Sequence, residues 1–236
     1  MKLFFATLLF TATMMTNLKA GDSPMALEYL VRQPKIKSTK PPVLILLHGR
    51  GGNEEDLFSF ADQLPGKFLI VSVRAPILLS EGSYAWYSVD FSSGKPVINQ
   101  ADAEKSRNII IQFIRELKEK YLVDDQQIYL CGFSQGAIMS YSVGLTRPDL
   151  VKGIAVMSGR LLDEIKPLIS SKEKLQSLRI FISHGTNDNT LRFGYALESV
   201  AYLKSLNLNP VFKQYEEGHG INKQMLSDLI TWLNEN

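Results

Sequence analysis

A serine flanked by glycines is the clearest chemical signal in the chain. The residues Gly132-Phe133-Ser134-Gln135-Gly136 fit the pattern G-x-S-x-G, in which a sharp strand-to-helix turn exposes a nucleophilic serine. The apolar run 128–131 precedes this turn, and the small and apolar residues 137–145 follow it, as a buried strand and a buried helix require. Glycine on either side permits strand and helix to approach closely. We therefore expect Ser134 to be a nucleophile.

A serine hydroxyl is a weak nucleophile, so this chemistry needs a histidine that accepts its proton and a carboxylate that orients the histidine. The chain contains three histidines. His48 and His184 each precede a glycine at a predicted strand end, where imidazoles often satisfy local backbone groups. His219 lies between glycines in a loop after the last predicted strand and is free to reach the serine. We predict His219 as the base.

Three carboxylates compete for the place of the acid. Asp188 follows a late strand in a tight turn of the kind that fixes a side chain. Asp163 follows the preceding strand at some distance, and Glu217 is too near His219 in sequence to approach its ring easily. Asp188 is therefore the predicted acid, and the chain order Ser, Asp, His is that of a known hydrolase triad.

An oxyanion hole is the remaining requirement for acyl chemistry. The residue after the nucleophile supplies one backbone N–H, here Gln135, and an early loop between a strand and a helix supplies the other. The glycine-rich loop 47–53 is in that place, and it leaves Arg50 or Gly51 as donor, with Arg50 favoured. A phosphate-binding loop is the competing interpretation, but the Gly-Lys-Ser/Thr ending and G-x-G-x-x-G spacing are missing.

Strand-like and helix-like segments alternate along the chain, which predicts a mostly parallel sheet with helices on both faces. Strands are expected at 26–31, 43–47, 68–73, 128–131, 151–158, 178–183 and 210–215. Helices are expected at 54–64, 99–121, 137–145, 193–206 and 222–233, with a helical or irregular region at 161–175. Residues 77–98 are rich in aromatics without a clear period and predict a long ordered loop that either walls a binding site or covers the sheet end.

Length and composition set the limits. With 236 residues, 45% hydrophobic and 21% charged, the chain suits one large α/β domain. A formal net charge of +2 gives no electrostatic argument for nucleic acid. Cys131 is the single cysteine, which excludes an intramolecular disulfide and is read as a core residue. His48 and His184 have no partner at metal-ligand spacing, so neither a metal nor a cofactor is expected.

The first twenty residues have the pattern of a signal peptide. Lys2 precedes an apolar run that starts at Leu3, and Leu18-Lys19-Ala20 resembles a cleavage site before Gly21. The run is too short to span a bilayer. We predict residues 1–20 to be a removed signal peptide, residues 21–236 to be one catalytic domain, and the protein to be exported. The alternative is an N-terminal extension of a cytoplasmic protein.

These motifs together resemble one family. Leu46-Leu47-His48-Gly49-x-Gly51-Gly52, Gly132-Phe133-Ser134-Gln135-Gly136-Ala137, His184-Gly185-Thr186-x-Asp188 and Gly218-His219 are similar to the phospholipase/carboxylesterase family of small α/β-hydrolases, which includes the acyl-protein thioesterases. The resemblance implies an α/β-hydrolase fold of about seven or eight strands with little or no lid. It also implies Ser134, Asp188 and His219 as the triad, Arg50 and Gln135 as oxyanion donors, and Trp86 with Tyr87 at the pocket wall.

The function expected from these residues is that of a serine carboxylesterase. Such an enzyme cleaves short- to medium-chain esters through an acyl-enzyme, with a small-molecule ester as partner and without stable membrane insertion. Alternatives within enzymes are an exported esterase of acylated or feruloylated polysaccharide, a thioesterase and a lysophospholipase. A hydrolase-like binding protein without turnover is the alternative from another class. Oligomeric state, acyl length and alcohol half stay open.

Overall fold

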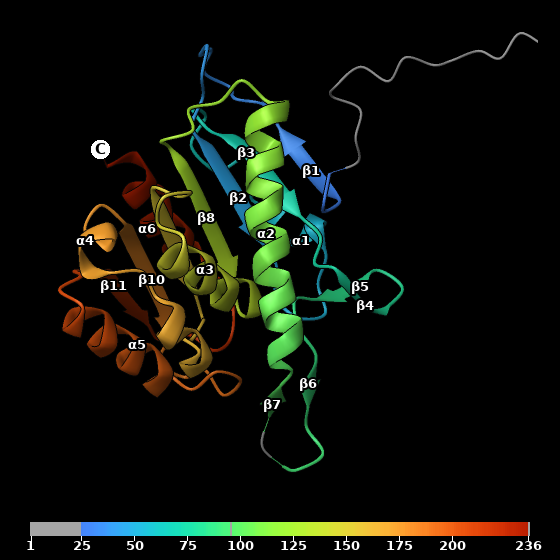
Figure 1. The fold of residues 1–236 in the computed structure, drawn as a ribbon, viewed down its shortest axis with the longest axis vertical. Helices are drawn as coiled ribbons and strands as arrows, with labels where there is room; N and C mark the ends of the chain where they lie inside the picture. Colours follow the sequence, from blue (N-terminus) through green and yellow to red (C-terminus); the bar gives the residue numbers. More distant parts are fainter. Residues whose placement is uncertain (1–24, 95, 236) are drawn as a thin grey trace, which may run out of the picture.

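A seven-stranded sheet forms the centre of the computed structural model, which describes residues 25–94 and 96–235 (Figure 1). The strand order is β1-β3-β2-β8-β9-β10-β11. β1 is antiparallel to β3, and the other neighbouring pairs are parallel. The predicted mostly parallel sheet is therefore confirmed. The strands are β1 (Tyr29–Arg32), β2 (Val43–Leu47), β3 (Leu69–Val73), β8 (Ile128–Phe133), β9 (Gly153–Met157), β10 (Arg179–Gly185) and β11 (Val211–Tyr215).

Helices cover both faces of the sheet, because successive side chains of the buried strands point to opposite sides. Ile45 and Leu47 of β2 join the apolar cluster formed with α2 (Gln100–Lys120), α3 (Gln135–Thr146) and α5 (Gly194–Ser205). Leu44 and Leu46 join the cluster formed with α1 (Glu54–Phe58) and α6 (Lys223–Asn234). All five residues of β2 are buried, as its continuous apolar run requires.

Helix α2 shows how the sequence pattern builds one of these layers. The Asn99 side chain caps the helix by accepting the N–H of Asp102, and Lys118 and Lys120 lie in the last turn. Ile110, Phe113, Ile114 and Leu117 recur at helical spacing and are all fully buried. The apolar stripe faces the sheet, so burial rather than propensity orients the helix.

Two predicted segments differ from the structure. The helix expected at 54–64 ends at Phe58, because Phe60 N–H donates to Leu57 and Ala61 N–H donates to Phe58, which tightens the chain into turns. Residues 77–98 form two short antiparallel ribbons instead of a loop without elements. The ribbons pair β4 (Ile77–Ser80) with β5 (Ser83–Ala85) and β6 (Val89–Asp90) with β7 (Val97–Ile98), and they extend from the main body (Figure 1). The region 161–175 contains the 3₁₀ helix η1 (Asp163–Leu168) and α4 (Lys172–Leu175).

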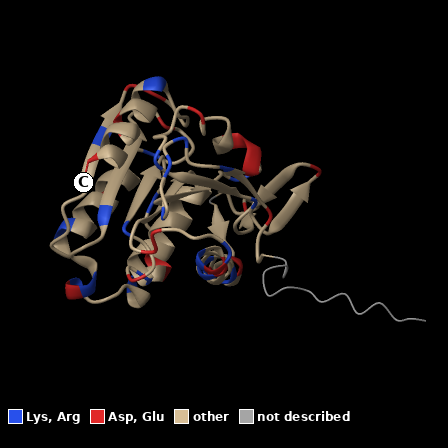
Figure 2. Cartoon of the chain, turned by 90° about the horizontal axis from the view of Figure 1, so that it is seen from above, with Lys and Arg blue, Asp and Glu red and all other residues tan. Residues whose placement is uncertain are grey.

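Acidic and basic residues are interspersed over the described part of the chain. Figure 2 looks along the axis of α2, where blue and red positions lie side by side around the helix. None of the helices in the described ranges is both long and apolar enough to cross a membrane.

Candidate active site

Ser134 lies at the turn between β8 and α3, and its backbone has φ 54° and ψ −117°, a positive φ that residues with a Cβ rarely adopt. The flanking glycines are needed there for close approach. A Cβ on Gly132 would lie 2.2 Å from the carbonyl carbon of Gly136, and one on Gly136 would lie 2.0 Å from the carbonyl oxygen of Leu47. The turn is therefore sterically restricted to glycine at both positions, as the G-x-S-x-G interpretation predicts.

The structure brings the side chains of Ser134, His219 and Asp188 together through two successive contacts. Ser134 Oγ lies 2.9 Å from His219 Nε2, and His219 Nδ1 lies 2.7 Å from Asp188 Oδ2. These residues follow β8, β11 and β10 at the carboxyl ends of the strands, where open α/β sheets place their sites. The Asp188 side chain is fully buried and that of His219 is 17% exposed. The His219 ring also packs against Phe133, with 5.0 Å between ring centroids.

The loop after β10, which carries Asp188, packs directly against the loop after β11, which carries His219. Asn187 N–H donates to the carbonyl of Glu217, so the loop of the carboxylate is bonded to the loop of the histidine. Gly185 lies where they meet, and a Cβ there would be 2.3 Å from that same Glu217 oxygen. Asp188 Oδ1 accepts the N–H groups of Thr190 and Leu191, each at 2.8 Å. One carboxylate oxygen is thus held by its own turn, and the other faces the imidazole.

The competing carboxylates point elsewhere. Asp163 pairs with Lys166 at 2.6 Å, and its side chain is 86% exposed. Glu217 accepts hydrogen bonds from the N–H of Gly218 at 3.0 Å and from the side chain of Asn222 at 3.2 Å. Asp188 is therefore the carboxylate of the three that contacts the imidazole of His219.

The hydrogen bonds of the loop after β2 distinguish between Arg50 and Gly51, the two candidates for the second oxyanion donor. Gly51 N–H donates to the carbonyl of Tyr84 at 2.7 Å, and Gly52 N–H donates to Gly49 at 3.2 Å. Within the described residues, neither the N–H of Arg50 nor that of Gln135 donates to another backbone carbonyl, and the side chain of Ser134 does not cap α3. The geometry leaves these two amides available to an incoming oxygen, whereas that of Gly51 is occupied.

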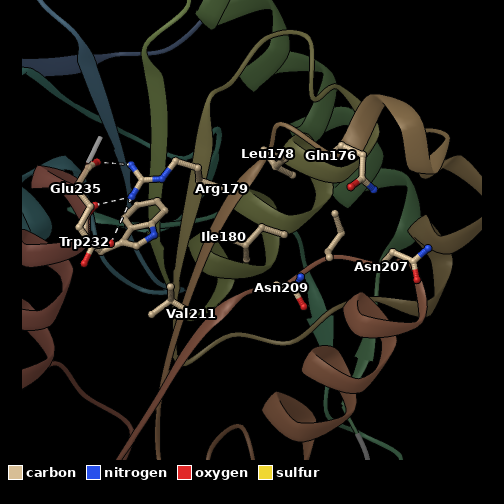
Figure 3. A pocket seen from close by; sticks show the side chains of 10 residues that line it. Gln176, Leu178, Arg179, Ile180, Asn207, Asn209, Val211, Trp232 and Glu235 are labelled. Atoms are coloured by element: carbon tan, nitrogen blue, oxygen red, sulfur yellow. Dashed lines mark hydrogen bonds and ion pairs between the residues drawn. The ribbon is translucent and has the colours of Figure 1, made fainter.

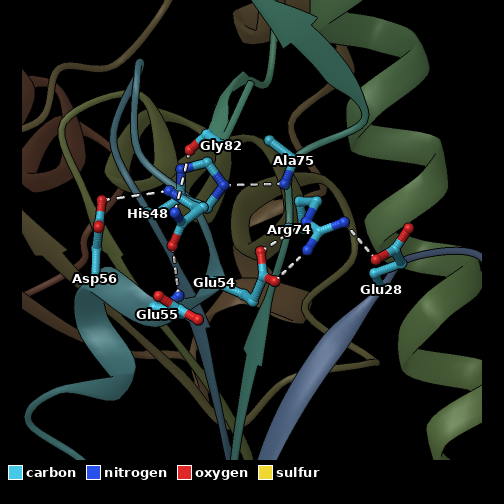
Figure 4. Close-up of polar contacts among 9 residues, drawn as sticks. Glu28, His48, Glu54, Glu55, Asp56, Arg74, Ala75 and Gly82 are labelled. Atoms are coloured by element: carbon cyan, nitrogen blue, oxygen red, sulfur yellow. Dashed lines mark hydrogen bonds and ion pairs between the residues drawn. The ribbon is translucent and has the colours of Figure 1, made fainter. Parts of the chain in front are cut away.

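A network of ion pairs and hydrogen bonds centred on Arg74 lies next to the loop after β2 (Figure 4). The Arg74 guanidinium bonds both carboxylate oxygens of Glu54 and also pairs with Glu28. It lies 4.8 Å from the ring of Tyr84, whose backbone bonds the glycines of the loop. The pKa of the Glu54 carboxyl is lowered, first because of the hydrogen bond from Arg74. Arg74 therefore connects α1, the N-terminal segment and the β5 ribbon at one point.

His48 is fully enclosed in the same region. Its Nδ1 lies 2.7 Å from the carbonyl of Gly49, and its Nε2 accepts the N–H of Ala75 at 3.0 Å. A carbonyl only accepts, so the proton is assigned to Nδ1 and the ring is neutral. Burial lowers the pKa of His48. The histidine satisfies local backbone groups, as the sequence indicated.

Trp86 and Tyr87 are buried beside the elbow. The indole N–H of Trp86 donates to the His48 carbonyl at 2.8 Å. The side-chain amide of Gln135 accepts the N–H of Trp86 at 3.0 Å and donates to the carbonyl of Tyr87 at 2.9 Å. This clamp was not predicted, because the sequence does not reveal contacts between residues so far apart. Contact of either aromatic with substrate stays a prediction.

A separate pocket of about 420 Å³ lies at the amino-terminal ends of the strands, whereas Ser134, Asp188 and His219 follow the carboxyl ends (Figure 3). It is lined by residues at the beginnings of β10 and β11, such as Arg179 and Val211. The Arg179 guanidinium donates to the carbonyls of Trp232 and Glu235 at 2.9 Å each, and so caps the end of α6. Within residues 25–94 and 96–235, no group of three or more His, Cys, Asp or Glu side chains could hold a metal ion.

Comparison with known proteins confirms the predicted fold and family. The profile of the Phospholipase/Carboxylesterase family matches residues 30–236, and the chain belongs to this family of α/β-hydrolases. Acyl-protein thioesterase 1 of Yarrowia lipolytica is 27% identical over 218 residues, which are 85% of this chain and 94% of that protein. Carboxylesterase SOBER1 of Arabidopsis thaliana is 25% identical over 164 residues, 67% of this chain and 71% of that protein.

A solved structure shares the fold. The Bacillus cereus carboxylesterase superposes with a TM-score of 0.76 at 23% identity, covering 88% of this chain and 93% of its own. The chain is therefore an enzyme of a family of carboxylesterases and acyl-protein thioesterases, a class that hydrolyses esters and thioesters.

The prediction that the protein is exported is wrong. The relatives that match the chain include acyl-protein thioesterases and plant carboxylesterases, and this finding contradicts export. The residues 1–20 on which the prediction rested lie outside the described residues. A short apolar run after one lysine satisfies the pattern of a signal peptide through composition alone, and composition did not decide the compartment here.

Proposed function

We propose that this protein is a serine carboxylesterase that cleaves short- to medium-chain carboxylic esters through an acyl-enzyme on Ser134. The observation that carries the proposal is the unbroken contact from Ser134 Oγ to His219 at 2.9 Å and from His219 to Asp188 at 2.7 Å. Residues 21–236 are proposed as one catalytic domain that contains these three residues.

The protonation states follow from the partners. The Asp188 carboxylate only accepts, so it fixes the proton of neutral His219 on Nδ1 and leaves the Nε2 lone pair facing the serine hydroxyl. His219 Nε2 removes the proton as Ser134 Oγ forms a bond to the ester carbonyl carbon. The resulting imidazolium lies against the buried carboxylate, which stabilises its positive charge.

Collapse of the tetrahedral intermediate completes the first half of the reaction. The N–H groups of Arg50 and Gln135 stabilise the oxyanion, and His219 gives its proton to the alcohol oxygen as the C–O bond breaks. Water then attacks the acyl-enzyme by the same route: His219 takes a proton from water and returns it to Ser134. The products are a carboxylic acid and an alcohol, and the enzyme is regenerated.

Single-residue variants test the assignment. Ser134→Ala is expected to lower kcat for p-nitrophenyl acetate about 10⁶-fold, and Asp188→Asn about 10⁴-fold. Asp163→Asn is the matched control, since its carboxylate lies on the surface, and it is expected to stay within about twofold of wild type. A larger loss in Asp163→Asn than in Asp188→Asn would refute the acid assignment.

The substrate class needs its own measurement. The names of the relatives include both carboxylesterases and acyl-protein thioesterases, so oxygen esters and thioesters are compared directly. We expect kcat/KM to be highest for p-nitrophenyl esters of short to medium acyl chains, with Trp86 and Tyr87 limiting chain length. A higher kcat/KM for acyl thioesters of matched chain length would reassign the enzyme as a thioesterase.

A further inference from the structure

Two imidazoles face the carboxylate of Asp188, and the proposed mechanism uses one of them. Asp188 Oδ2 lies 2.7 Å from His219 Nδ1 and 3.3 Å from His184 Nε2. The side chains of His184 and Asp188 are both 0% exposed. Burial makes the ring of His184 costly to ionise, although the nearby carboxylate favours the charged form. A proton gained by His184 would compete with His219 for the negative charge of Asp188.

The contacts of His184 define its tautomer. Its Nε2 lies 2.7 Å from the carbonyl of Leu191, which can only accept, so Nε2 carries the proton. Its Nδ1 is buried and has no hydrogen-bond partner within the described residues. Protonation of Nδ1 would create a charged donor without an acceptor, which disfavours the imidazolium. Burial correspondingly lowers the pKa of His184.

The bond from His184 reaches the turn that holds the carboxylate. Leu191 N–H donates to Asp188 Oδ1 at 2.8 Å, and the carbonyl of the same residue is the acceptor of His184. His184 belongs to β10, a rigid strand of the central sheet. Leu191 therefore connects the turn to the sheet through His184 and also donates a hydrogen bond to the carboxylate of Asp188.

We propose that His184 is a positioning residue, which as a neutral Nε2–H imidazole holds the Asp188 turn against β10 so that Oδ2 meets His219. This inference rests on the proposed serine esterase mechanism. Its neutrality matters because Asp188 and His219 are the ionisable groups that face it. A second imidazolium at Oδ2 would compete with His219 for one negative charge and make His219 a weaker base.

Two substitutions separate positioning from simple packing. His184→Leu keeps a side chain of moderate size but removes the donor, whereas His184→Gln places an amide N–H near the position of Nε2. His184→Leu is expected to lower kcat for p-nitrophenyl acetate about 100-fold with KM changed less than about threefold, as a displacement of about 1 Å can do. His184→Gln is expected to restore kcat to within about tenfold of wild type.

The pH profile supplies a readout that a merely structural role would not move. Withdrawal of Asp188 from His219 would stabilise the imidazolium less, so the acidic limb of kcat/KM should shift to lower pH in His184→Leu and stay in place in His184→Gln. Equal losses of kcat in both variants, or an acidic limb that is unshifted or raised in His184→Leu, would overturn the inference.

A double variant tests whether His184 acts through Asp188. In an Asp188→Asn background, His184→Leu should reduce kcat by less than about threefold, because the group that it positions is already lost. A further loss of about 100-fold would show an independent role and overturn the inference. If Asp188→Asn and Ser134→Ala are themselves active, the proposed function fails instead, and the two failures are thereby distinguished.

Nuclear magnetic resonance tests the tautomer in the wild-type protein, even if His184→Leu does not fold. The chain has three histidines, and the ring signals can be assigned with the variants His48→Gln and His184→Gln. We expect the ¹⁵N signals of His184 to show protonated Nε2 and bare Nδ1 at pH 7. A charged ring or the Nδ1–H tautomer at pH 7 would overturn the proposal.

Discussion

The side-chain oxygen of Gln135 accepts a hydrogen bond from the backbone N–H of Trp86 at 3.0 Å. The amide nitrogen of Gln135 completes the pair by donating to the carbonyl of Tyr87. Gln135 is 4% exposed, so both bonds form away from water. The side chain of Gln135 thus holds the backbone of Trp86 and Tyr87 in place with one accepted and one donated hydrogen bond.

Loss of this clamp should affect both stability and rate. Gln135→Ala keeps the backbone N–H of the proposed oxyanion hole but leaves two buried backbone groups unpaired, which costs about 2–4 kcal/mol in the free energy of unfolding. We expect kcat to fall about tenfold as the segment shifts. Urea unfolding and ester hydrolysis measure the two effects. Gln112→Ala, in an exposed pair on α2, is the control and should cost under about 0.5 kcal/mol; equal costs would contradict the clamp.

The backbone of Ser134 carries strain that glycine can relieve. Its φ of 54° is unfavourable for a residue with a Cβ. Ser134→Gly should therefore be more stable than Ser134→Ala by about 1 kcal/mol, although both lack the nucleophile. Chemical denaturation of the two inactive variants tests this. A Ser134→Gly variant that is no more stable than Ser134→Ala would show that the turn stores no such strain.

Removal of Arg74 should destabilise the protein through Glu54. The Glu54 side chain is 10% exposed, so Arg74→Ala leaves a mostly buried carboxylate without its partner, at a cost of about 3 kcal/mol. The loop after β2 loses its support through Tyr84, and kcat should fall more than KM rises.

The control for Arg74→Ala is Lys35→Ala. Lys35 pairs with Asp62 on the surface, where the side chains are 49% and 86% exposed. Its removal should cost about 0–1 kcal/mol and leave kcat unchanged. Thermal melting and steady-state kinetics compare the variants. Equal melting temperatures for Arg74→Ala and Lys35→Ala would remove the supporting role of Arg74.

Stability should decrease as the pH falls from 7 to 5. Burial lowers the pKa values of His48 and His184 below the ordinary histidine value of 6.5. Below pH 6.5 the unfolded chain therefore binds protons that the folded protein excludes, and stability is lost progressively toward the lower folded pKa values. Urea unfolding across this range measures the slope. His48→Gln and His184→Gln should each flatten it, and an unchanged slope in both would exclude these rings as its source.

Residue types and strand-end positions were sufficient to predict a serine, an aspartate and a histidine that the structure brings into contact. Ser134, Asp188 and His219 could be picked out because few residue types perform this chemistry and because parallel strands place their carboxyl ends at one edge. The same alternation predicted the sheet and its covering helices. These features can be predicted from local sequence, because each depends on composition and spacing within one segment.

Only the tertiary structure decided how the segments meet. It showed that Tyr84 occupies the N–H of Gly51, that Gln135 clamps Trp86, and that His184 shares the carboxylate of Asp188. The two ribbons within 77–98 were not predicted either, because strands of two to four residues carry too little periodicity to be recognised. Contacts between residues far apart in the chain depend on how strands and loops pack against one another. No spacing within a single segment encodes that packing.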